Sequence, residues 1–211
     1  MQVLKKKDKE RPIIIVGKDC PRENIWRTNI YPEYKCTRKS ENYISQFFKL
    51  VYNEGLFSQH TQAILEHPNL EADDCLALTT KRILSTRPDD KIYIVTGDMD
   101  YLQLAQENKV ELWNLKYKKL TDAKSSFNNS KKDLFFKIML GDKSDNILPV
   151  LKQKGGAKEV QKCFDDEEYF KTRLQDKDNM ERYTLNKTLI DFDEIPELII
   201  NEFNNSQLLI N

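Results

Sequence analysis

The chain has 211 residues, 39% of them hydrophobic, and its 34 Lys and Arg balance 34 Asp and Glu. This composition predicts a globular fold, and six Gly with seven Pro exclude collagen-like and Gly-rich disordered chains. No apolar run approaches the roughly 18 residues of a membrane span, and the N-terminus lacks the apolar segment of a secretory signal. Four dispersed cysteines without a CxxC spacing argue against a disulfide scaffold or a zinc site, so we expect a cytoplasmic protein.

Charge alternates in blocks along the chain. Residues 1–40 and 116–158 are basic, whereas residues 41–115 and 159–211 are acidic. A polyanion lying on the basic blocks, with a metal held by the acidic one, would use this pattern. A set of solvated faces would explain it equally well.

Hydrophobic patterning predicts an α/β fold with a mainly parallel, twisted sheet and helices on both faces. The predicted buried strands are residues 12–16, 91–96 and 110–115. The predicted helices between them are residues 40–57, 71–84 and 102–107. Beyond a polar loop at residues 121–132, only helices are predicted, at residues 133–140, 157–164, 167–174 and 196–203. We therefore expect an α/β core over residues 1–140 and a helical region over 141–211.

Three acidic motifs fall where this architecture would bring them together. EADD opens a predicted helix, GDMD follows a predicted strand, and GDKSDN follows the last helix of the core. Open α/β sheets bind ligands at the carboxyl ends of their strands. The candidate ligands are Glu71, Asp73, Asp74, Asp98, Asp100, Asp142 and Asp145. We expect their carboxylates to converge on one cleft, with Asp73 pointing slightly away as a water-mediated ligand.

Carboxylates without neighbouring His or thiolate ligands favour a hard cation such as Mg²⁺ or Mn²⁺. Two such ions about 4 Å apart can clamp a scissile phosphate and activate water. Each motif alone also has a plainer explanation. EADD could be ordinary charge at a helix start, GDMD a strand-end turn or the DxD of a nucleotide-sugar transferase or phosphatase, and GDKSDN a capped loop.

Together, EADD, IVTGDMDYLQL and GDKSDNI resemble the 5′-nuclease superfamily. That family includes flap endonucleases and the 5′-3′ exonuclease domains of bacterial DNA polymerases, and the similarity is greatest to phage RNase H-type 5′ nucleases. Two further stretches share the resemblance. They are DCPRENIWR with YKCTR at residues 19–38, and LIDFDEIP at residues 189–196.

The resemblance implies a PIN-like 5′-nuclease core followed by a helix-three-turn-helix, with two bound Mg²⁺ ions that Mn²⁺ can replace. Asp19, Glu71, Asp73 and Asp74 would surround the first ion, Asp98 and Asp100 would lie between the ions, and Asp142 and Asp145 would serve the second. Lys35 and Arg38 would reach the scissile phosphate as catalytic residues. The residues implied to bind nucleic acid are Arg27, Lys35, Arg38, Lys152, Lys154, Gly155, Gly156 and Lys158.

The implied function is metal-dependent 5′-3′ exonuclease and flap endonuclease activity, with RNase H-like removal of RNA primers in DNA replication or repair. The implied partners are DNA or RNA–DNA hybrid with a 5′ end or flap, and single-strand-binding or replication proteins, at a replication site that suits a phage or viral origin. Two alternatives remain open. One is a protein of the same fold that binds branched nucleic acid but cuts poorly, and the other is an unrelated DxD enzyme using a nucleotide sugar.

The sequence departs from the family pattern at its start. The family opens with a central strand that carries its first metal-binding aspartate, whereas residues 1–12 contain only Asp8 and Glu10 as acids, neither of them after an apolar strand. We therefore expect this strand and its ligand to be absent from the 211 residues, as in a fragment, a split gene product or a chain translated from an internal start.

Overall fold

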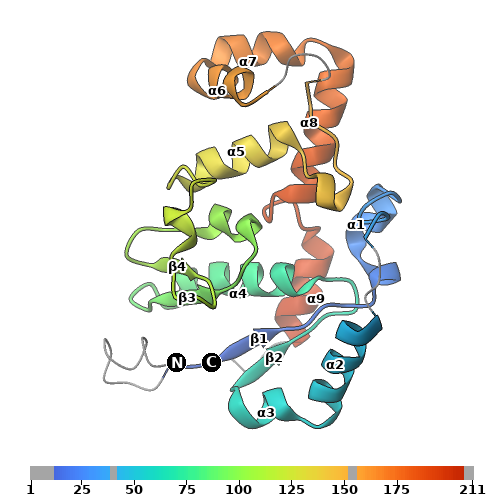
Figure 1. Cartoon of the computed structure of the whole chain (residues 1–211), viewed down its shortest axis with the longest axis vertical. Coiled ribbons are helices and arrows are strands. Elements are labelled where there is room, and N and C mark those ends of the chain that lie inside the picture. Colours follow the sequence, from blue (N-terminus) through green and yellow to red (C-terminus); the bar gives the residue numbers. More distant parts are fainter. Residues whose placement is uncertain (1–11, 39–41, 152–155, 207–211) are drawn as a thin grey trace.

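The computed structural model describes residues 12–38, 42–151 and 156–206, in which short strands alternate with helices (Figure 1). The elements up to the second strand are β1 (Ile15–Gly17), η2 (Arg22–Asn24), α1 (Trp26–Ile30), α2 (Asn42–Asn53), α3 (Leu56–His60) and β2 (Ala63–Leu65). The middle of the chain forms α4 (Ala72–Thr86), β3 (Ile92–Val95), η3 (Met99–Leu104), β4 (Val110–Trp113) and η4 (Leu120–Asp122). The remaining elements are α5 (Ser130–Leu140), η5 (Lys143–Asp145), α6 (Ala157–Asp165), α7 (Glu167–Leu174), α8 (Lys177–Ile190) and α9 (Glu197–Ser206).

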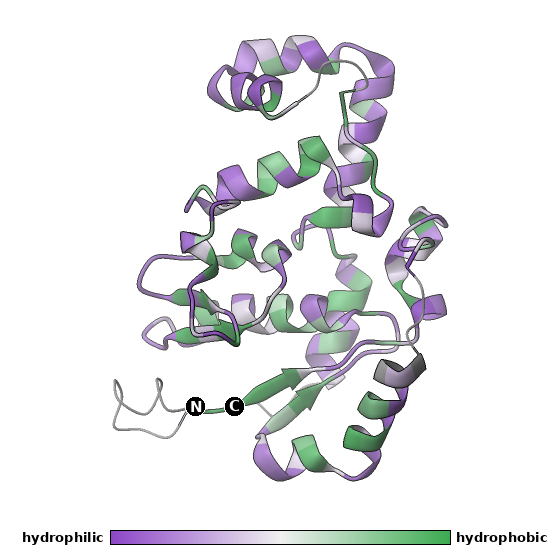
Figure 2. Cartoon of the chain, in the orientation of Figure 1, coloured by the Kyte–Doolittle hydropathy of each residue, from purple (hydrophilic) through white to green (hydrophobic). Residues whose placement is uncertain are grey.

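The strands pair in parallel, which confirms the predicted α/β class. β1 lies beside β2 with Ile15 opposite Ala63, and β3 lies beside β4 with Ile92 opposite Val110. Within the described residues these are two separate pairs and not one continuous sheet. In Figure 1, α3 lies below the β1–β2 pair and α4 above it, and both contact the pair. Figure 2 shows the hydrophobic character of β1 and β2.

Each of the three predicted strands overlaps an observed one, although β1 includes only residues 15 and 16 of the predicted 12–16, and two of the predicted segments are less buried than predicted. Ile13 precedes β1 and is 56% exposed, and Val95 at the end of β3 is 55% exposed. All three residues of β1 are only half-buried. The sequence pattern identified the extended segments but overestimated how completely the helices cover their ends.

The C-terminal residues pack back onto the β1–β2 side of the molecule. Phe192, Ile195 and Phe203 share a buried cluster with Leu65 at the end of β2 and with Leu70. A separate cluster joins α5 to α6 and α7 at the other end of the molecule. Within the described residues, no helix is both long and apolar enough to cross a membrane.

Among the described strands and α-helices, β2, α1 and α8 escaped prediction, and one predicted helix is divided. β2 is only three residues long, α1 is a single short turn, and α8 has a largely polar sequence whose buried face includes Asn186. The helix predicted over residues 40–57 becomes α2 and α3, which meet at Gly55 with a φ of 62°. The helix predicted over residues 102–107 is instead the 3₁₀ helix η3, which begins earlier, at Met99, and ends at Leu104.

Two glycines permit close approaches that shape the site. A Cβ on Gly17 would lie 2.7 Å from the carbonyl oxygen of Ala72, so glycine lets β1 reach the start of α4. Gly141 ends α5 with a φ of 71°, and a Cβ there would lie 2.4 Å from the carbonyl oxygen of Ile147. Gly141 thereby lets the GDKSDN loop fold back tightly after α5.

Candidate metal centre

The predicted acidic residues stand at the starts of three helical elements. Glu71 is the N-cap of α4, Asp98 of η3 and Asp142 of η5. A carboxylate at this position accepts backbone N–H bonds and interacts favourably with the positive end of the helix dipole. Asp98 accepts from the N–H of Asp100, and Asp142 from that of Ser144. Local capping chemistry therefore explains why each motif adopts its conformation.

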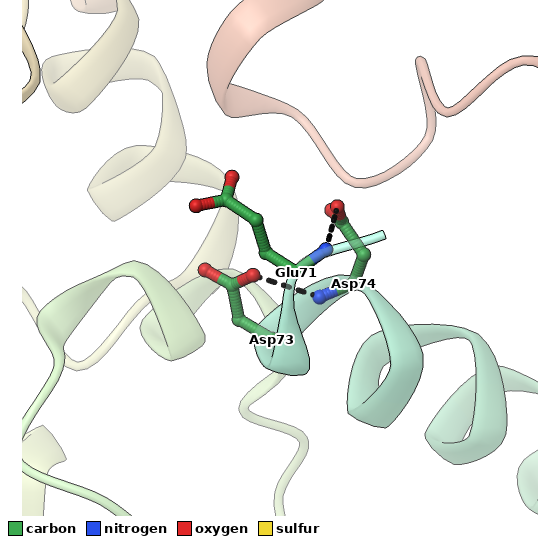
Figure 3. A group of neighbouring side chains, drawn as sticks. All are labelled: Glu71, Asp73 and Asp74. Carbon is green, nitrogen blue, oxygen red and sulfur yellow. Dashed lines mark hydrogen bonds between the residues drawn. The ribbon is translucent and has the colours of Figure 1, made fainter. Parts of the chain in front are cut away.

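The first carboxylate group consists of Glu71, Asp73 and Asp74, each with an oxygen within 4.8 Å of the others (Figure 3). Glu71 and Asp74 form a capping box, in which the side chain of each residue accepts a hydrogen bond from the backbone N–H of the other. Figure 3 shows the Glu71 and Asp73 carboxylates on one side of the helix start and the Asp74 carboxylate on the other. Asp74, and not Asp73 as expected, is the member that points away.

Asp74 is fully buried and is held by Arg27. The two terminal nitrogens of Arg27 each lie 2.7 Å from an Asp74 oxygen, and Trp26 Nε1 donates to Asp74 Oδ2 at 3.2 Å. Arg27 Nε donates to the carbonyl oxygen of Leu189 at 2.7 Å. The resemblance places Arg27 among the nucleic-acid-binding residues, but it is only 2% exposed and its guanidinium is engaged within the protein. In the structure, Arg27 instead holds Glu71 and Asp74 of the first carboxylate group in place.

Asp73 carries the electrostatic stress of this group. Burial and the adjacent charges of Asp74 and Glu71 raise its pKa well above the ordinary value of 3.8. Asp73 accepts a hydrogen bond from the backbone N–H of Asp74. Within the described residues, Asp73 Oδ1 and Oδ2 make no ion pair with Lys or Arg. A bound cation would relieve this repulsion.

The second carboxylate group consists of Asp100, Asp142 and Asp145, again with oxygens within 4.8 Å of one another. Lys137 from α5 lies between two of them, 2.6 Å from Asp100 Oδ1 and in contact with Asp142 Oδ2. Burial alone would raise the pKa of Asp142, but hydrogen bonds from Lys137 and Ser144 outweigh it and lower the pKa to about 2. Burial dominates at Asp100 and raises its pKa.

Lys35 joins the two carboxylate groups. Its ammonium contacts Glu71 Oε1 in the first group and lies 3.7 Å from Asp145 Oδ2 in the second. Its backbone has a φ of 55°, unusual for a side chain of this size, and its N–H donates to the carbonyl oxygen of Asp145 at 2.9 Å. Arg38 pairs with Asp145 Oδ1. The structure thus brings both predicted catalytic cations to the carboxylates.

Other predicted residues lie at the margins or outside the described chain. Asp19 and Asp98 are exposed and belong to neither carboxylate group, although Asp19 accepts from the N–H of Ala72 at 2.8 Å. Gly156 is the N-cap of α6, and Lys158 is exposed on that helix. The predicted residues Lys152, Lys154 and Gly155 lie outside the described residues, as do Asp8 and Glu10.

Two residues of the centre were missed. Lys137 lies five residues before Asp142, on the other side of the end of α5. This spacing matches no sequence motif that predicts contact between two side chains. Tyr34 precedes Lys35 within the resembling YKxxR stretch, and its hydroxyl donates to Glu71 Oε2 at 3.0 Å. Tyr34 could therefore have been predicted from that stretch, whereas Lys137 is identified only from its contacts in the folded structure.

The residues fit a hard divalent cation. Both groups offer only carboxylate oxygens, the preferred ligands of Mg²⁺ and Mn²⁺. Burial, with the charges of neighbouring carboxylates added to it, raises the pKa of Asp73 and that of Asp100, so both groups are costly to ionise without a bound cation. In the structure, Lys35, Arg38 and Lys137 offset part of the negative charge of the carboxylates.

Comparison with known proteins identifies similar chains. The family model described as 5′-3′ exonuclease, N-terminal resolvase-like domain, matches residues 1–133. Ribonuclease H of Enterobacteria phage T4 is 27% identical over 222 residues, covering 92% of this chain and 70% of that protein. A 5′-3′ exonuclease of Mycoplasmopsis pulmonis is 28% identical over 161 residues, covering 66% of this chain and 50% of that protein. This chain thus spans half the length of the Mycoplasmopsis relative.

A solved structure also matches. It is a pseudo-enzyme–product complex of the bacteriophage T5 D15 flap endonuclease with DNA and metal ions, with a TM-score of 0.67 and 19% identity. The alignment covers 97% of this chain and 86% of that one. At this identity the likeness establishes a shared fold.

Proposed function

Because the chain belongs to the family of the 5′-3′ exonuclease N-terminal resolvase-like domain, we propose that it is a divalent-metal-dependent 5′ nuclease. It hydrolyses phosphodiester bonds of DNA or of RNA–DNA hybrids that present a 5′ end or flap. The names of its relatives, a ribonuclease H, a 5′-3′ exonuclease and a flap endonuclease, support this substrate class. Primer removal in DNA replication or repair is the process that such an activity serves.

The observation that carries the proposal is the pair of carboxylate groups joined by Lys35. Glu71 and Asp73 would hold one Mg²⁺ ion, with Asp19 and Asp98 at its margin. Asp100, Asp142 and Asp145 would hold a second, and Mn²⁺ would substitute for either. Such ions supply an activated water and stabilise the leaving oxygen of a phosphodiester. Asp74 contributes by fixing Glu71 through the capping box and Arg27.

Lys35 and Arg38 are the chain's own electrophilic groups. Both have their positive charge at the edge of the carboxylate groups, and acidic neighbours raise the pKa of each above its ordinary value despite burial. They therefore stay protonated and would compensate the negative charge that grows on phosphate oxygens during hydrolysis. The left-handed backbone of Lys35, fixed by Asp145, keeps its ammonium in place before substrate arrives.

Substrate binding would rest on phosphate contacts. We assign them to Lys35, Arg38, Lys158 and the start of α6 at Gly156, with Lys152, Lys154 and Gly155 preceding it. Residues 1–140 would form the catalytic core and residues 141–211 the helical DNA-binding region. Affinity should then fall with salt by a log–log slope of about −0.9 per phosphate neutralised. Single-strand-binding or replication proteins would be its partners at the replication site.

The alternative of a branched-nucleic-acid-binding protein that cuts poorly is less favoured. Two carboxylate groups with Lys35 and Arg38 beside them exceed what binding to a polyanion needs, since carboxylates repel phosphate. A nucleotide-sugar enzyme would need only the GDMD motif and leaves the family match unexplained.

The proposal is tested with a duplex carrying a 5′ flap and with an RNA-primed duplex. We expect cleavage in Mg²⁺ or Mn²⁺, none in EDTA, and a fall of about 100-fold or more in Asp100→Asn. The matched control is Asp193→Asn, whose exposed carboxylate pairs with Lys81 away from both carboxylate groups. Tight binding of flap DNA without cleavage in either cation would instead establish the binding-protein alternative.

A further inference from the structure

A cavity of about 630 Å³ lies at the carboxyl end of β3 and β4. It adjoins the second carboxylate group along the chain, because its lining residue Met99 directly precedes Asp100. The lining residues that matter here are Gly97, Met99, Trp113, Tyr117, Lys118 and Lys119. The volume is within the range of about 300–1,000 Å³ that small-molecule sites occupy.

One wall of the cavity is a tightly closed turn over residues 114–118. The N–H of Asn114 donates to the carbonyl oxygen of Lys118 at 2.9 Å. Asn114 Oδ1 accepts from the N–H groups of Lys116 and Lys118, at 2.9 and 3.1 Å. Tyr117 sits in this turn with a φ of 58° and is 60% exposed. A strained backbone thus presents an aromatic ring to solvent, where it serves no core packing.

The side chains around the cavity pair aromatic rings with positive charge. Trp113 is half-buried, and Lys119 Nζ lies 5.3 Å from the centre of its ring and 3.1 Å from Glu111 Oε2. Lys116 and Lys118 are exposed on the turn beside Tyr117. Aromatic rings that stack on bases, set among lysines that contact phosphates, are how proteins bind unpaired nucleotides without reading their sequence.

We propose that this cavity binds one unpaired nucleotide of the substrate strand, adjoining the phosphate that the carboxylate groups hold. The inference rests on the proposed function, and it adds a subsite to it. The base stacks on the exposed ring of Tyr117, with Trp113 beside it, and Lys118 contacts a phosphate. Met99 lines the cavity and directly precedes Asp100 of the second carboxylate group, so a nucleotide in the cavity would adjoin one held at that group.

Tryptophan emission provides a test that needs no cleavage. The chain has two tryptophans, of which Trp26 is 3% exposed and Trp113 lines the cavity. The full chain is titrated, in EDTA and again in Ca²⁺, with a duplex bearing a single-stranded 5′ extension and with a blunt duplex of the same length. We expect quenching by the extended duplex only, and loss of that quenching in Trp113→Phe, whose remaining emission comes from Trp26.

Variants of the turn test the stacking itself. Tyr117→Asn removes the ring while keeping a residue that tolerates the left-handed backbone, and should weaken binding of the extended duplex about fivefold or more. Tyr117→Phe keeps the ring and should bind as the wild type does. Lys177→Ala is the matched control, since its lysine is 88% exposed on α8 and pairs only weakly with Glu181, at 3.6 Å.

Equal quenching by the blunt duplex, no quenching at all, or an unchanged affinity in Tyr117→Asn would overturn the proposal. Equal quenching by a free nucleoside monophosphate at the same nucleotide concentration would overturn the assignment to the substrate strand. Cleavage measured in parallel separates this inference from the proposed function. If the chain cuts flap DNA but the extended duplex does not quench its tryptophan emission, the nucleotide site in the cavity is overturned and the proposed nuclease activity is not. A chain that shows the expected quenching but does not cut supports the cavity and overturns the nuclease.

Discussion

The two carboxylate groups have the same size and chemistry but are built in different ways. Glu71, Asp73 and Asp74 come from one helix start, and a buried arginine fixes them from behind. Asp100 comes from η3, whereas Asp142 and Asp145 come from the loop after α5, and a half-exposed Lys137 lies among them. The first group is therefore defined by local sequence and the second by the packing of distant segments.

This difference predicts where each group is vulnerable. The first should fail when its buried charge is uncompensated, because desolvated ions depend strongly on their partners. The second should fail when α5 and its following loop shift relative to η3, because Asp100 comes from η3 whereas Asp142 and Asp145 come from that loop. The variants below separate these two modes, from the largest expected effect to the smallest.

Arg27→Ala should have the largest effect on stability. It leaves the fully buried Asp74 carboxylate without its two 2.7 Å partners, and should lower the free energy of unfolding by about 3–5 kcal/mol. Denaturant unfolding measures the loss. If the alanine variant does not fold, Arg27→Lys, which keeps the charge but not the bidentate geometry, should show a smaller loss of the same kind.

The control is Arg87→Ala, which removes a partly exposed ion pair with Asp90 and should cost less than about 1 kcal/mol. Similar losses at Arg27 and Arg87 would contradict the view that the first group depends on a buried charge pair.

Gly141→Ala should damage the second group selectively. The added Cβ would collide with the carbonyl oxygen of Ile147 in a left-handed backbone, at a cost of about 2–3 kcal/mol. The loop carrying Asp142 and Asp145 should move, and calorimetric titration with Mn²⁺ should show one site weakened and the other retained. Gly97→Ala is the matched control for stability, because its Cβ would meet no atom within 4 Å. Equal weakening of both sites would show that the two groups are not independent.

Asn186→Ala should act on the same loop more mildly. The buried Asn186 amide donates to the carbonyl oxygens of Ile138 and Leu148, each at 2.8 Å, and so ties the end of α5 to the segment after the loop. Losing it leaves both carbonyls unsatisfied and should cost about 1–2 kcal/mol, measured by thermal or denaturant unfolding. Thr184→Ala, at an exposed position of the same helix, should change stability little. A loss no larger than that of Thr184→Ala would exclude a role for Asn186 in the loop.

The same contrast explains what the sequence could predict. The acidic motifs were recognisable because each caps a helical element, which depends on neighbours only a few residues away. The arrangement of two groups about Lys35 was not derivable, because Lys35 meets Asp145 across a separation of 110 residues. The same applies to Arg27, whose bond to Leu189 spans 162 residues. Without that packing, an arginine beside a tryptophan is indistinguishable from a phosphate-binding residue.

Secondary structure followed the same rule. Strands β3 and β4 were predictable because their apolar runs are continuous, and α4 because acids open it. Helix α8 was missed because its buried face includes the polar Asn186, which is satisfied by two carbonyls that only the fold supplies. Sequence periodicity reports apolar burial and has no signal for a buried amide.

Asp73→Asn should have the smallest effect, and the opposite sign. Burial and the charges of Asp74 and Glu71 raise the pKa of Asp73 in the folded chain, so its ionised form opposes folding. Removing that charge should raise the free energy of unfolding at pH 7 in the absence of divalent cations. Asparagine can still accept the N–H of Asp74, so the helix start is preserved. The gain should vanish as the pH falls through the ordinary value of 3.8, where the wild-type carboxyl is protonated in both states. Unfolding at a series of pH values, with and without Mg²⁺, measures the gain in stability.

In Mg²⁺ the wild type should become the more stable of the two, since it gains stability from the bound ion and the variant gains less. A variant less stable than the wild type without cations would mean that Asp73 is a structural acceptor and not a strained ligand.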